Sequence, residues 1–231
     1  MKLSLLRKIK ENDECYTFVF ANENNISWKA GQYMQYTLPH EPMDDRGDKR
    51  WFSISSAPSE KEIHLTTRIT AEKGSSFKKA LLALQPGEEI TADTPEGDFI
   101  LDTPPDNIIF VAGGIGITPY RAILKDLQAR SIPMNITLLY ANRSLELTTF
   151  KDELESIKRT NPGLLIDYFF GERFITKEDL KKAALRFVKP IFYVSGPEPM
   201  VEAFKKTLQE IGIDDEHSRF DYFPGYSIVL N

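Results

Sequence analysis

The stretch Ile108-Ile109-Phe110-Val111-Ala112-Gly113-Gly114-Ile115-Gly116-Ile117-Thr118-Pro119 decides the fold of the second half of the chain. It begins with an unbroken apolar run, which is typical of a parallel strand buried on both faces. A glycine-rich turn follows, and Thr118 and Pro119 then suit the N-cap and the first position of a helix. The backbone amides of such a turn, together with the helix dipole, favour a pyrophosphate. A purely structural turn is the alternative.

The same rhythm of strand and helix continues to the end of the chain. We expect strands at 136–140, 165–170, 191–194 and 219–222, and helices at 120–129, 150–158, 177–185 and 200–211. This alternation predicts a doubly wound parallel sheet with right-handed crossovers. A second turn, Ser195-Gly196-Pro197-Glu198-Pro199, follows the strand at 191–194. We therefore expect the two glycine turns to line one crevice at a topological switch point.

Towards the N-terminus the pattern changes to short, closely spaced strands. We expect them at 16–20, 31–38, 50–58, 62–69 and 89–92, with one helix at 76–84. Strands of this length and spacing predict an antiparallel barrel or sandwich. The change of pattern places the domain boundary near Thr103-Pro104-Pro105, a stiff linker. The prediction is a β + α/β chain: an antiparallel barrel domain over residues 1–103 and an α/β domain over residues 104–231.

Arg50-Trp51-Phe52-Ser53-Ile54-Ser55-Ser56-Ala57-Pro58 is the most informative stretch of the barrel domain. Strand alternation sends Arg50 and Phe52 to one face, and Trp51 and Ser53 to the other. An arginine fork can hold a phosphate, and a neighbouring ring can cover a planar heterocycle. The stretch therefore suits a ligand that is flat at one end and phosphorylated at the other. The alternative is an ordinary amphipathic strand with Arg50 on the rim.

Gly74-Ser75-Ser76 precedes the one expected helix of the barrel domain. Glycine permits close backbone approach, and a helix N-terminus favours an anion, so a second phosphate contact is expected here. The alternative is a plain capping turn.

Composition restricts the function classes. A net charge of −5 without a basic tract argues against nucleic-acid binding, and no apolar run approaches the roughly 20 residues of a membrane span. The first six residues lack the features of a secretion signal, so the chain is predicted to be cytoplasmic. Cys15 stands alone, and His40, His64 and His217 are far apart, so neither a metal site nor an iron–sulfur cluster is expected. Redox chemistry would then need a bound organic cofactor.

Taken in order, these motifs resemble the ferredoxin–NADP reductase family. The motifs are Ala-Gly-Gln-Tyr at 30–33, Arg-x-Phe-Ser at 50–53, Gly-x-Ser at 74–76, Pro-Glu-Gly-Asp-Phe at 95–99, Gly-Gly-x-Gly-x-Thr-Pro at 113–119 and Gly-Pro-x-x-Met at 196–200. The resemblance covers nearly the whole chain. It implies a flavin on the barrel domain and a nicotinamide nucleotide on the α/β domain, without an iron–sulfur domain.

The resemblance also implies roles for single residues of the barrel domain. Arg50 should hold the flavin phosphate, Phe52 should lie against the isoalloxazine, and Ser53 should hydrogen-bond near flavin N5. The remaining predicted flavin contacts are Gly74, Ser75 and Ser76 at the pyrophosphate, together with Trp51 and Thr67. Trp51, as the largest side chain of its stretch, is also expected to pack in the barrel core.

On the α/β domain, the predicted nicotinamide nucleotide contacts are Gly114, Gly116, Thr118, Pro119, Gly196 and Pro197. Ser53 and Ser195 are the predicted catalytic positions, one on each side of the hydride transfer. The family usually has tyrosine where Phe52 stands, so one buried hydrogen bond of about 1 kcal/mol is missing. Many members have cysteine where Ser195 stands, so the placement of the nicotinamide is expected to differ.

Two further assignments leave alternatives open. Phe223 or Tyr226 is a candidate shield for the flavin, and packing of the last strand is the alternative. After the second strand of the α/β domain, Arg143 and Ser144 suit the 2′-phosphate of NADPH, whereas Glu146 suits the 2′-hydroxyl of NADH. We favour NADPH.

The leading hypothesis is an oxidoreductase that passes hydride from NAD(P)H to FAD and electrons to a separate acceptor. FAD is favoured over FMN because residues 74–76 offer a phosphate contact beyond Arg50. The acceptor would be a ferredoxin-like protein, an oxygenase, a partner subunit or a small molecule. The alternatives are a regulatory module that binds flavin and nucleotide without turnover, and a reductase of free flavin.

Overall fold

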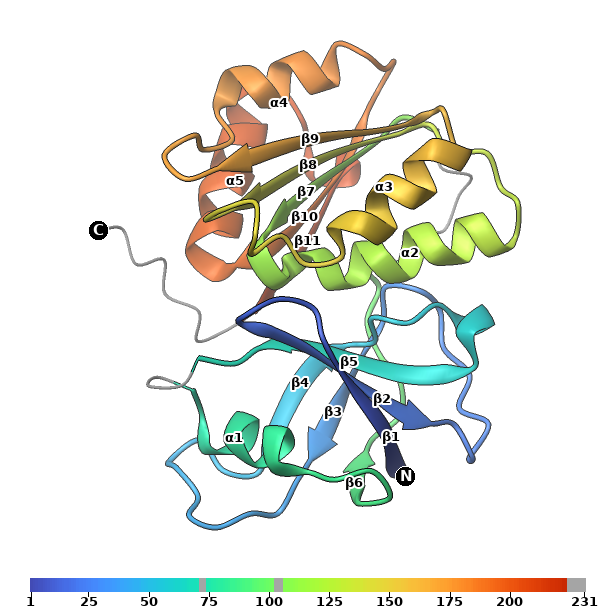
Figure 1. The fold of residues 1–231 in the computed structure, drawn as a ribbon. Coiled ribbons are helices and arrows are strands. Elements are labelled where there is room, and N and C mark those ends of the chain that lie inside the picture. Colours follow the sequence, from blue (N-terminus) through green and yellow to red (C-terminus); the bar gives the residue numbers. More distant parts are fainter. Residues whose placement is uncertain (71–73, 102–105, 224–231) are drawn as a thin grey trace.

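The computed structural model describes residues 1–70, 74–101 and 106–223, with Phe223 described by its backbone alone. It contains a six-stranded antiparallel sheet followed by a five-stranded parallel sheet (Figure 1). The predicted order of a barrel domain and an α/β domain is therefore confirmed. The predicted linker at 103–105 lies outside the described residues. Phe99 already packs in the core of the α/β domain, beside Tyr120 and Tyr193.

The barrel domain has the strand order β4-β3-β6-β1-β2-β5. Its strands are β1 (Lys2–Lys10), β2 (Cys15–Ala21), β3 (Tyr33–Thr37), β4 (Lys49–Ser53), β5 (Glu62–Arg68) and β6 (Glu89–Ala92). The two edge strands β4 and β5 approach each other through the Ile54–Leu65 bridge. Helix α1 (Ser76–Ala83), capped by the Ser75 hydroxyl, packs Phe77 and Leu81 into the barrel core.

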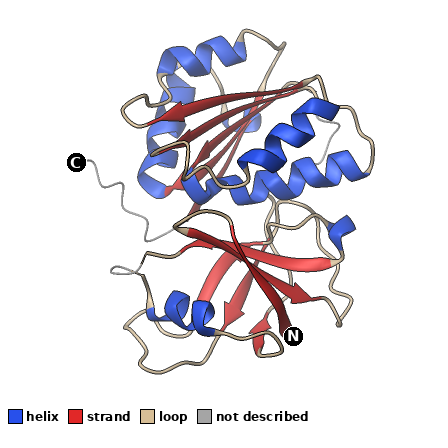
Figure 2. Cartoon of the chain, viewed as in Figure 1, coloured by secondary structure: helices blue, strands red, loops and turns tan. Residues whose placement is uncertain are grey.

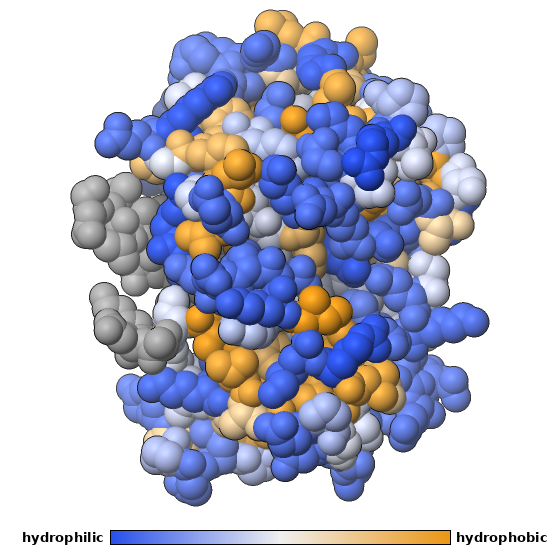
Figure 3. Space-filling view, in the orientation of Figure 1, coloured by the Kyte–Doolittle hydropathy of each residue, from blue (hydrophilic) through white to orange (hydrophobic). Residues whose placement is uncertain are grey.

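Strand β1 is the one strand that the sequence did not predict. The apolar pair Leu5-Leu6 breaks strict alternation, and the register with β2 shifts between Leu5 and Arg7. Leu5 is buried, whereas Leu6 is 43% exposed and Ile9, beyond the shift, is 40% exposed. Figure 3 shows apolar surface on the front of the barrel domain, interspersed with hydrophilic residues.

The α/β domain has the strand order β11-β10-β7-β8-β9, and all its strands are parallel. The strands are β7 (Ile108–Gly113), β8 (Ile136–Asn142), β9 (Leu164–Phe170), β10 (Ile191–Pro197) and β11 (Ser218–Phe223); the helices are α2 (Thr118–Ala129), α3 (Lys151–Thr160), α4 (Lys177–Ala184) and α5 (Glu198–Glu210). Helices α2 and α3 cover one face of the sheet, and α4 and α5 cover the other (Figure 2). The doubly wound sheet is thus confirmed.

Short 3₁₀ helices complete the described chain: η1 (Pro58–Glu60), η2 (Gly114–Ile117) and η3 (Asp215–His217). None of the helices in the described residues has the length and apolar character required to cross a bilayer.

Candidate functional site

The two glycine turns meet where the strand order reverses. Strand β7 pairs with β10, with Ala112 opposite Ser195. The prediction of a turn at 195–199 is wrong, because β10 continues to Pro197 and α5 begins at Glu198. A Cβ atom added to Gly116 would lie 2.3 Å from the Ser195 carbonyl oxygen. The backbones of the two glycine segments therefore pack directly on each other, and a shared crevice lined by both stays a prediction.

The prediction of Thr118 as N-cap is wrong. The preceding turn winds as the 3₁₀ helix η2 and runs directly into α2, so Thr118 is already helical. Its hydroxyl donates to the Ile115 carbonyl at 3.1 Å, and Pro119 follows within the first turn as expected. Gly114 has φ +53° and no atom within 4 Å of an added Cβ, so this position has room beside the backbone for a ligand.

Asp221 is a site residue that the sequence reasoning missed. Ser195 is fully buried, and its hydroxyl donates to the Asp221 carboxylate at 3.4 Å. Burial, with the charge of Asp98, raises the pKa of Asp221 to about 7, although the Ser195 hydroxyl acts in the opposite direction. The available signal was an acidic residue within the aromatic end segment, at the carboxyl end of the last strand.

Tyr33, on β3 of the barrel domain, lies near the Asp221 carboxylate. Burial is the main cause that raises the pKa of the Tyr33 phenol, and the nearby carboxylates of Glu96, Asp221 and Asp98 contribute further. Tyr33 also stands opposite Ser53 in the β3–β4 ladder. The two predicted catalytic serines therefore come from different domains: Ser53 stands beside Tyr33, and Ser195 bonds to Asp221.

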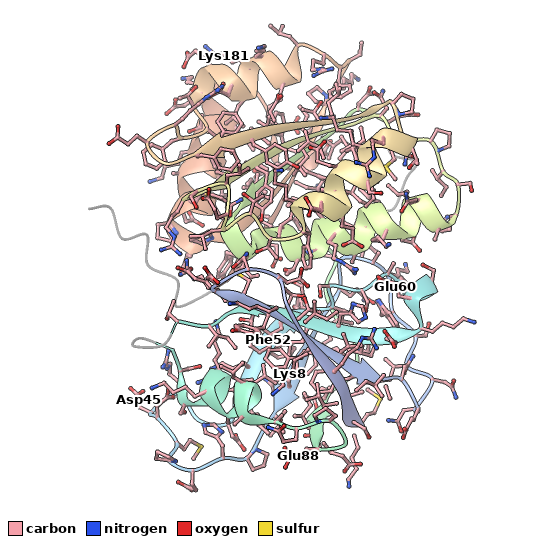
Figure 4. All side chains as sticks on the ribbon, in the orientation of Figure 1. Lys8, Asp45, Phe52, Glu60, Glu88 and Lys181 are labelled. Atoms are coloured by element: carbon pink, nitrogen blue, oxygen red, sulfur yellow. The ribbon has the colours of Figure 1, made fainter. Side chains whose placement is uncertain are left out.

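The inward face of β4 carries Phe52, whereas the sequence predicted that Trp51 would point into the barrel core. Trp51 is 46% exposed and meets the Tyr33 ring edge-on, so the prediction that it packs in the barrel core is wrong. Phe52 is only 8% exposed and packs against Phe77 and Tyr36 in that core, where Figure 4 labels it. The cause is the pairing with β3, because Phe52 stands opposite Met34, whose side chain points inward.

Arg50 and Ser76, the predicted phosphate contacts, already hold an anion. The Asp44 carboxylate accepts from the Ser76 amide at 2.8 Å and from Arg50 Nη2 at 3.4 Å. A hydrogen bond from Arg46, followed by that from the Ser76 amide, lowers the pKa of Asp44 far below its usual value. An internal carboxylate at this point shows that the donor set suits a negatively charged group.

The other groups of this set have their own partners. Arg50 Nη1 donates to the carbonyls of Arg46 and Gly47, and the guanidinium lies 5.5 Å from the Phe77 ring centre. The Ser76 hydroxyl contacts His40 Nε2 at 2.7 Å, while the Ser75 hydroxyl accepts from the Lys78 amide.

Two predicted flavin contacts lie on the β5 side of the barrel opening. Thr67 is buried on β5, and Gly74 closes a tight turn through its amide to the Thr70 carbonyl at 3.0 Å. The residues after β4 join β5 through the Ile54–Leu65 bridge and through the Ser55 amide and hydroxyl, which both donate to the His64 carbonyl. Arg50 thus lies on edge strand β4, Thr67 on edge strand β5, and Gly74 just before the cap of α1.

The predicted nucleotide-selecting residues also have partners within the chain. Arg143 forms a close ion pair with Glu14 of the barrel domain. The pKa of Glu146 is lowered, first by its own backbone amide and then by the Ser144 hydroxyl. Arg143 therefore carries a charge that is already neutralised across the domain boundary.

Phe223 ends β11, where its backbone stands opposite Pro197 of the second glycine turn. Its side chain and the whole of Tyr226 lie outside the described residues. Within the described part of the chain, no group of three or more His, Cys, Asp or Glu side chains is arranged to hold a metal ion.

Comparisons with known proteins agree with this architecture. Residues 110–206 match the model of the oxidoreductase NAD-binding domain. Flavohemoprotein A of Dictyostelium discoideum is 26% identical over 94% of this chain and 58% of its own length. The phthalate 4,5-dioxygenase oxygenase reductase subunit of Pseudomonas putida is 31% identical over 87% of this chain and 61% of the subunit. The chain thus spans less than two thirds of these curated relatives.

A solved structure matches almost end to end. Ferredoxin-NADP+ reductase from Plasmodium falciparum superposes with a TM-score of 0.83 over 96% of this chain and 95% of that one, at 19% identity. At this identity the likeness shows the fold. The chain therefore contains a match to the oxidoreductase NAD-binding domain and shares its fold with ferredoxin-NADP+ reductase.

Proposed function

We propose that the chain is a flavin-dependent NAD(P)H oxidoreductase. One observation carries the proposal: Tyr33, which stands opposite Ser53 in the barrel domain, lies close enough to Asp221, the partner of Ser195 in the α/β domain, for that carboxylate to raise the pKa of its phenol. A flavin bound at the barrel opening supplies the acceptor for hydride. The tasks of the protein are then orientation and exclusion of water.

Each predicted contact has a task in this proposal. Arg50 and the Ser76 amide hold phosphate oxygens after Asp44 moves away, and Ser53 donates to the reactive edge of the flavin. The glycine turns seat the nicotinamide nucleotide against η2 and the start of α2. FAD is favoured over FMN because Ser76 lies beyond Arg50 on the same anion site, which suits a pyrophosphate.

Ser195 and Asp221 form the far wall of the proposed hydride-transfer position. Asp221 has a pKa of about 7, so its proton can be held near neutral pH, where it would keep the crevice uncharged beside the nicotinamide. Exposed Trp51 is proposed to contact the flavin, and Phe52 to support β4 behind it from the barrel core.

The acceptor of the electrons is proposed to be a separate protein. One relative is named as the reductase subunit of a dioxygenase; this favours an oxygenase or a ferredoxin-like protein, acting in the cytoplasm. A regulatory module without turnover and a reductase of free flavin are the alternatives. The buried serine pair favours the enzyme, because a module that only binds would not need it.

Anaerobic stopped-flow mixing tests the proposal. Flavin-loaded protein is mixed with NADH and, separately, with NADPH, and flavin absorbance near its oxidised maximum is followed. Bleaching with at least one nucleotide supports the enzyme, and persistent yellow colour supports the regulatory module. Weak flavin retention with steady turnover of added flavin would identify the free-flavin reductase. Protein that takes up no flavin would refute all three.

A further inference from the structure

Arg121 is a buried cation that the hydride-transfer proposal does not use. It lies on α2 and is 7% exposed. Its guanidinium donates to the Ser55 carbonyl at 2.8 Å and to both carboxylate oxygens of Glu60, at 2.8 and 3.0 Å. It also donates to both carboxylate oxygens of Glu153, at 2.7 and 3.0 Å. Every nitrogen of the fork therefore has an acceptor.

The acceptors of Arg121 belong to two domains. Ser55 and Glu60 lie in the barrel domain, immediately after β4, whereas Glu153 lies on α3 of the α/β domain. Figure 4 labels Glu60 at the edge of the barrel domain that faces α2. The ring of Phe150 lies 5.2 Å from the guanidinium and covers it from the α/β side.

Both ends of this contact lie close in sequence to predicted site residues. Arg121 follows Thr118 and Pro119 within the first turns of α2, and Ser55 follows Ser53 by two residues. The guanidinium therefore links, by described hydrogen bonds, the segment that follows the proposed flavin strand and the helix proposed to seat the nicotinamide.

We propose that the Arg121–Glu60 bridge is a positioning device that sets the distance between nicotinamide and flavin. The inference rests on the proposed function. Hydride transfer needs its two reacting atoms about 3–3.5 Å apart, and a misplacement of about 1 Å can cost about a hundredfold in rate. A rigid bidentate pair is suited to this task because its planar geometry fixes both distance and angle.

The charges of Arg121 and Glu60 decide which of the two residues can be replaced without unfolding the protein. Burial alone would raise the pKa of Glu60, but the hydrogen bonds and charge of Arg121 lower the pKa below its usual value. Removing Arg121 would leave partly buried Glu60 without its cation and Glu153 with Lys125 alone, so an Arg121→Ala chain would risk unfolding. Changing one carboxylate at a time leaves the cation with the other carboxylate and the Ser55 carbonyl.

Glu60→Gln and Glu153→Gln form a matched pair. Each glutamate is held bidentately by the same guanidinium, but Glu60 spans the domains and Glu153 does not. Glutamine at 60 keeps an acceptor for the Ala57 amide, which donates to Glu60 at 2.7 Å. Glu153 additionally pairs with Lys125 at 3.2 Å, so the control removes no fewer contacts than the test variant.

The rate of flavin reduction is the first readout. Glu60→Gln should lower the rate constant at saturating nucleotide by about tenfold or more, with flavin and nucleotide dissociation constants within about threefold of the parent. Glu153→Gln should stay within about threefold in all three quantities. Equal slowing by both variants, or slowing accounted for by weaker binding alone, would overturn the proposal.

Hydrogen–deuterium exchange of the protein without nucleotide is the second readout. Glu60→Gln should speed exchange at both 54–57 and 118–123, whereas Glu153→Gln should speed it mainly in α3. Unchanged exchange at 54–57 and 118–123 in Glu60→Gln would overturn the bridge. If the parent protein reduces no flavin, the proposed function fails, while the exchange comparison still decides whether Glu60 couples the domains.

Discussion

Asp221 makes a pH-dependent prediction at the scale of one residue. Its carboxyl has a pKa of about 7 in the fold, compared with about 3.9 in an unfolded chain. The folded state therefore binds the extra proton, and the stability due to this group is full below pH 4 and is lost as pH rises through 7. Asp221→Asn should raise the melting temperature relative to the parent, and by more at pH 8 than at pH 5.

Thermal unfolding of the ligand-free protein at the two pH values measures this difference. Asp215→Asn removes an exposed carboxylate just before β11 and serves as the control. An equal gain from Asp221→Asn at pH 5 and pH 8 would contradict the burial argument.

Arg50 makes the second prediction at this scale. A charge-assisted contact to phosphate contributes about 1.5–3 kcal/mol, so Arg50→Ala should weaken flavin binding by roughly ten- to a hundredfold. Lys49→Ala removes the neighbouring positive charge from an exposed position and should change the affinity little. Titration of apoprotein with flavin, followed by fluorescence, measures both. Flavin affinity that does not change in Arg50→Ala would remove the phosphate role from this residue.

For Phe52 and Trp51, the sequence predicted that the rings lie on opposite faces of β4, but not which ring is buried. Alternation correctly put the two rings on opposite faces of β4, because a strand has a period of two. It could not say which face turns inward, since that depends on the β3 partner and on Phe77 of α1. Asp221 was missed for a related reason: its environment comes from Ser195 and Asp98, both distant in sequence.

The loop at 40–48 and helix α1 act together at the scale of elements. The Asp44 carboxylate accepts a hydrogen bond from the Ser76 amide and pairs with Arg50, so a phosphate at this site must displace Asp44. Asp44→Asn should bind flavin more tightly, by a few-fold to about tenfold, because a neutral side chain competes less well for both donors. The same variant without flavin should melt at a lower temperature.

Asp45→Asn is the control for this element, because it removes the same charge from the adjacent residue. Isothermal titration with FAD, together with melting curves of the apoproteins, gives both quantities. Weaker flavin binding by Asp44→Asn would mean that Asp44 organises the site and does not compete for it.

The elements themselves were largely predictable, and the exceptions have physical causes. The long apolar strands and the amphipathic helices of the α/β domain follow directly from local periodicity. Strand β1 was not predicted, because its register shifts between Leu5 and Arg7 and the alternation of apolar and polar residues is interrupted there. Thr118 was misplaced as a cap because η2 and α2 are continuous, and no local residue preference distinguishes a 3₁₀ turn from a loop at this point.

For the molecule as a whole, the two-domain order was predictable and the contacts between the domains were not. The change from closely spaced strands to alternating strand and helix is a property of long segments, and it separates the two sheets in Figure 1. Arg121 and Glu60 are 61 residues apart, and Arg143 and Glu14 are 129 apart. Pairs at such separations leave no pattern in a single sequence, although they determine how the two proposed binding sites face each other.

The Arg143–Glu14 pair leads to a prediction about nucleotide choice that involves both domains. Arg143 is the proposed reader of the 2′-phosphate of NADPH, but the Glu14 carboxylate neutralises its charge. Glu14→Gln keeps the size of the side chain and removes the charge. It should therefore raise the ratio of kcat/KM for NADPH over NADH, by about two- to fivefold for a surface pair worth up to about 1 kcal/mol.

Two further variants make this test decisive. Arg143→Ala should lower the ratio, and adding Glu14→Gln to Arg143→Ala should change it no further, because the carboxylate acts through the guanidinium. Raising the salt concentration should shrink the effect, since both side chains reach solvent: the exposed fractions are 61% for Arg143 and 25% for Glu14. A ratio that rises equally with and without Arg143 would mean that Glu14 acts on the nucleotide directly, and that the ion pair between the domains does not set the choice of nucleotide.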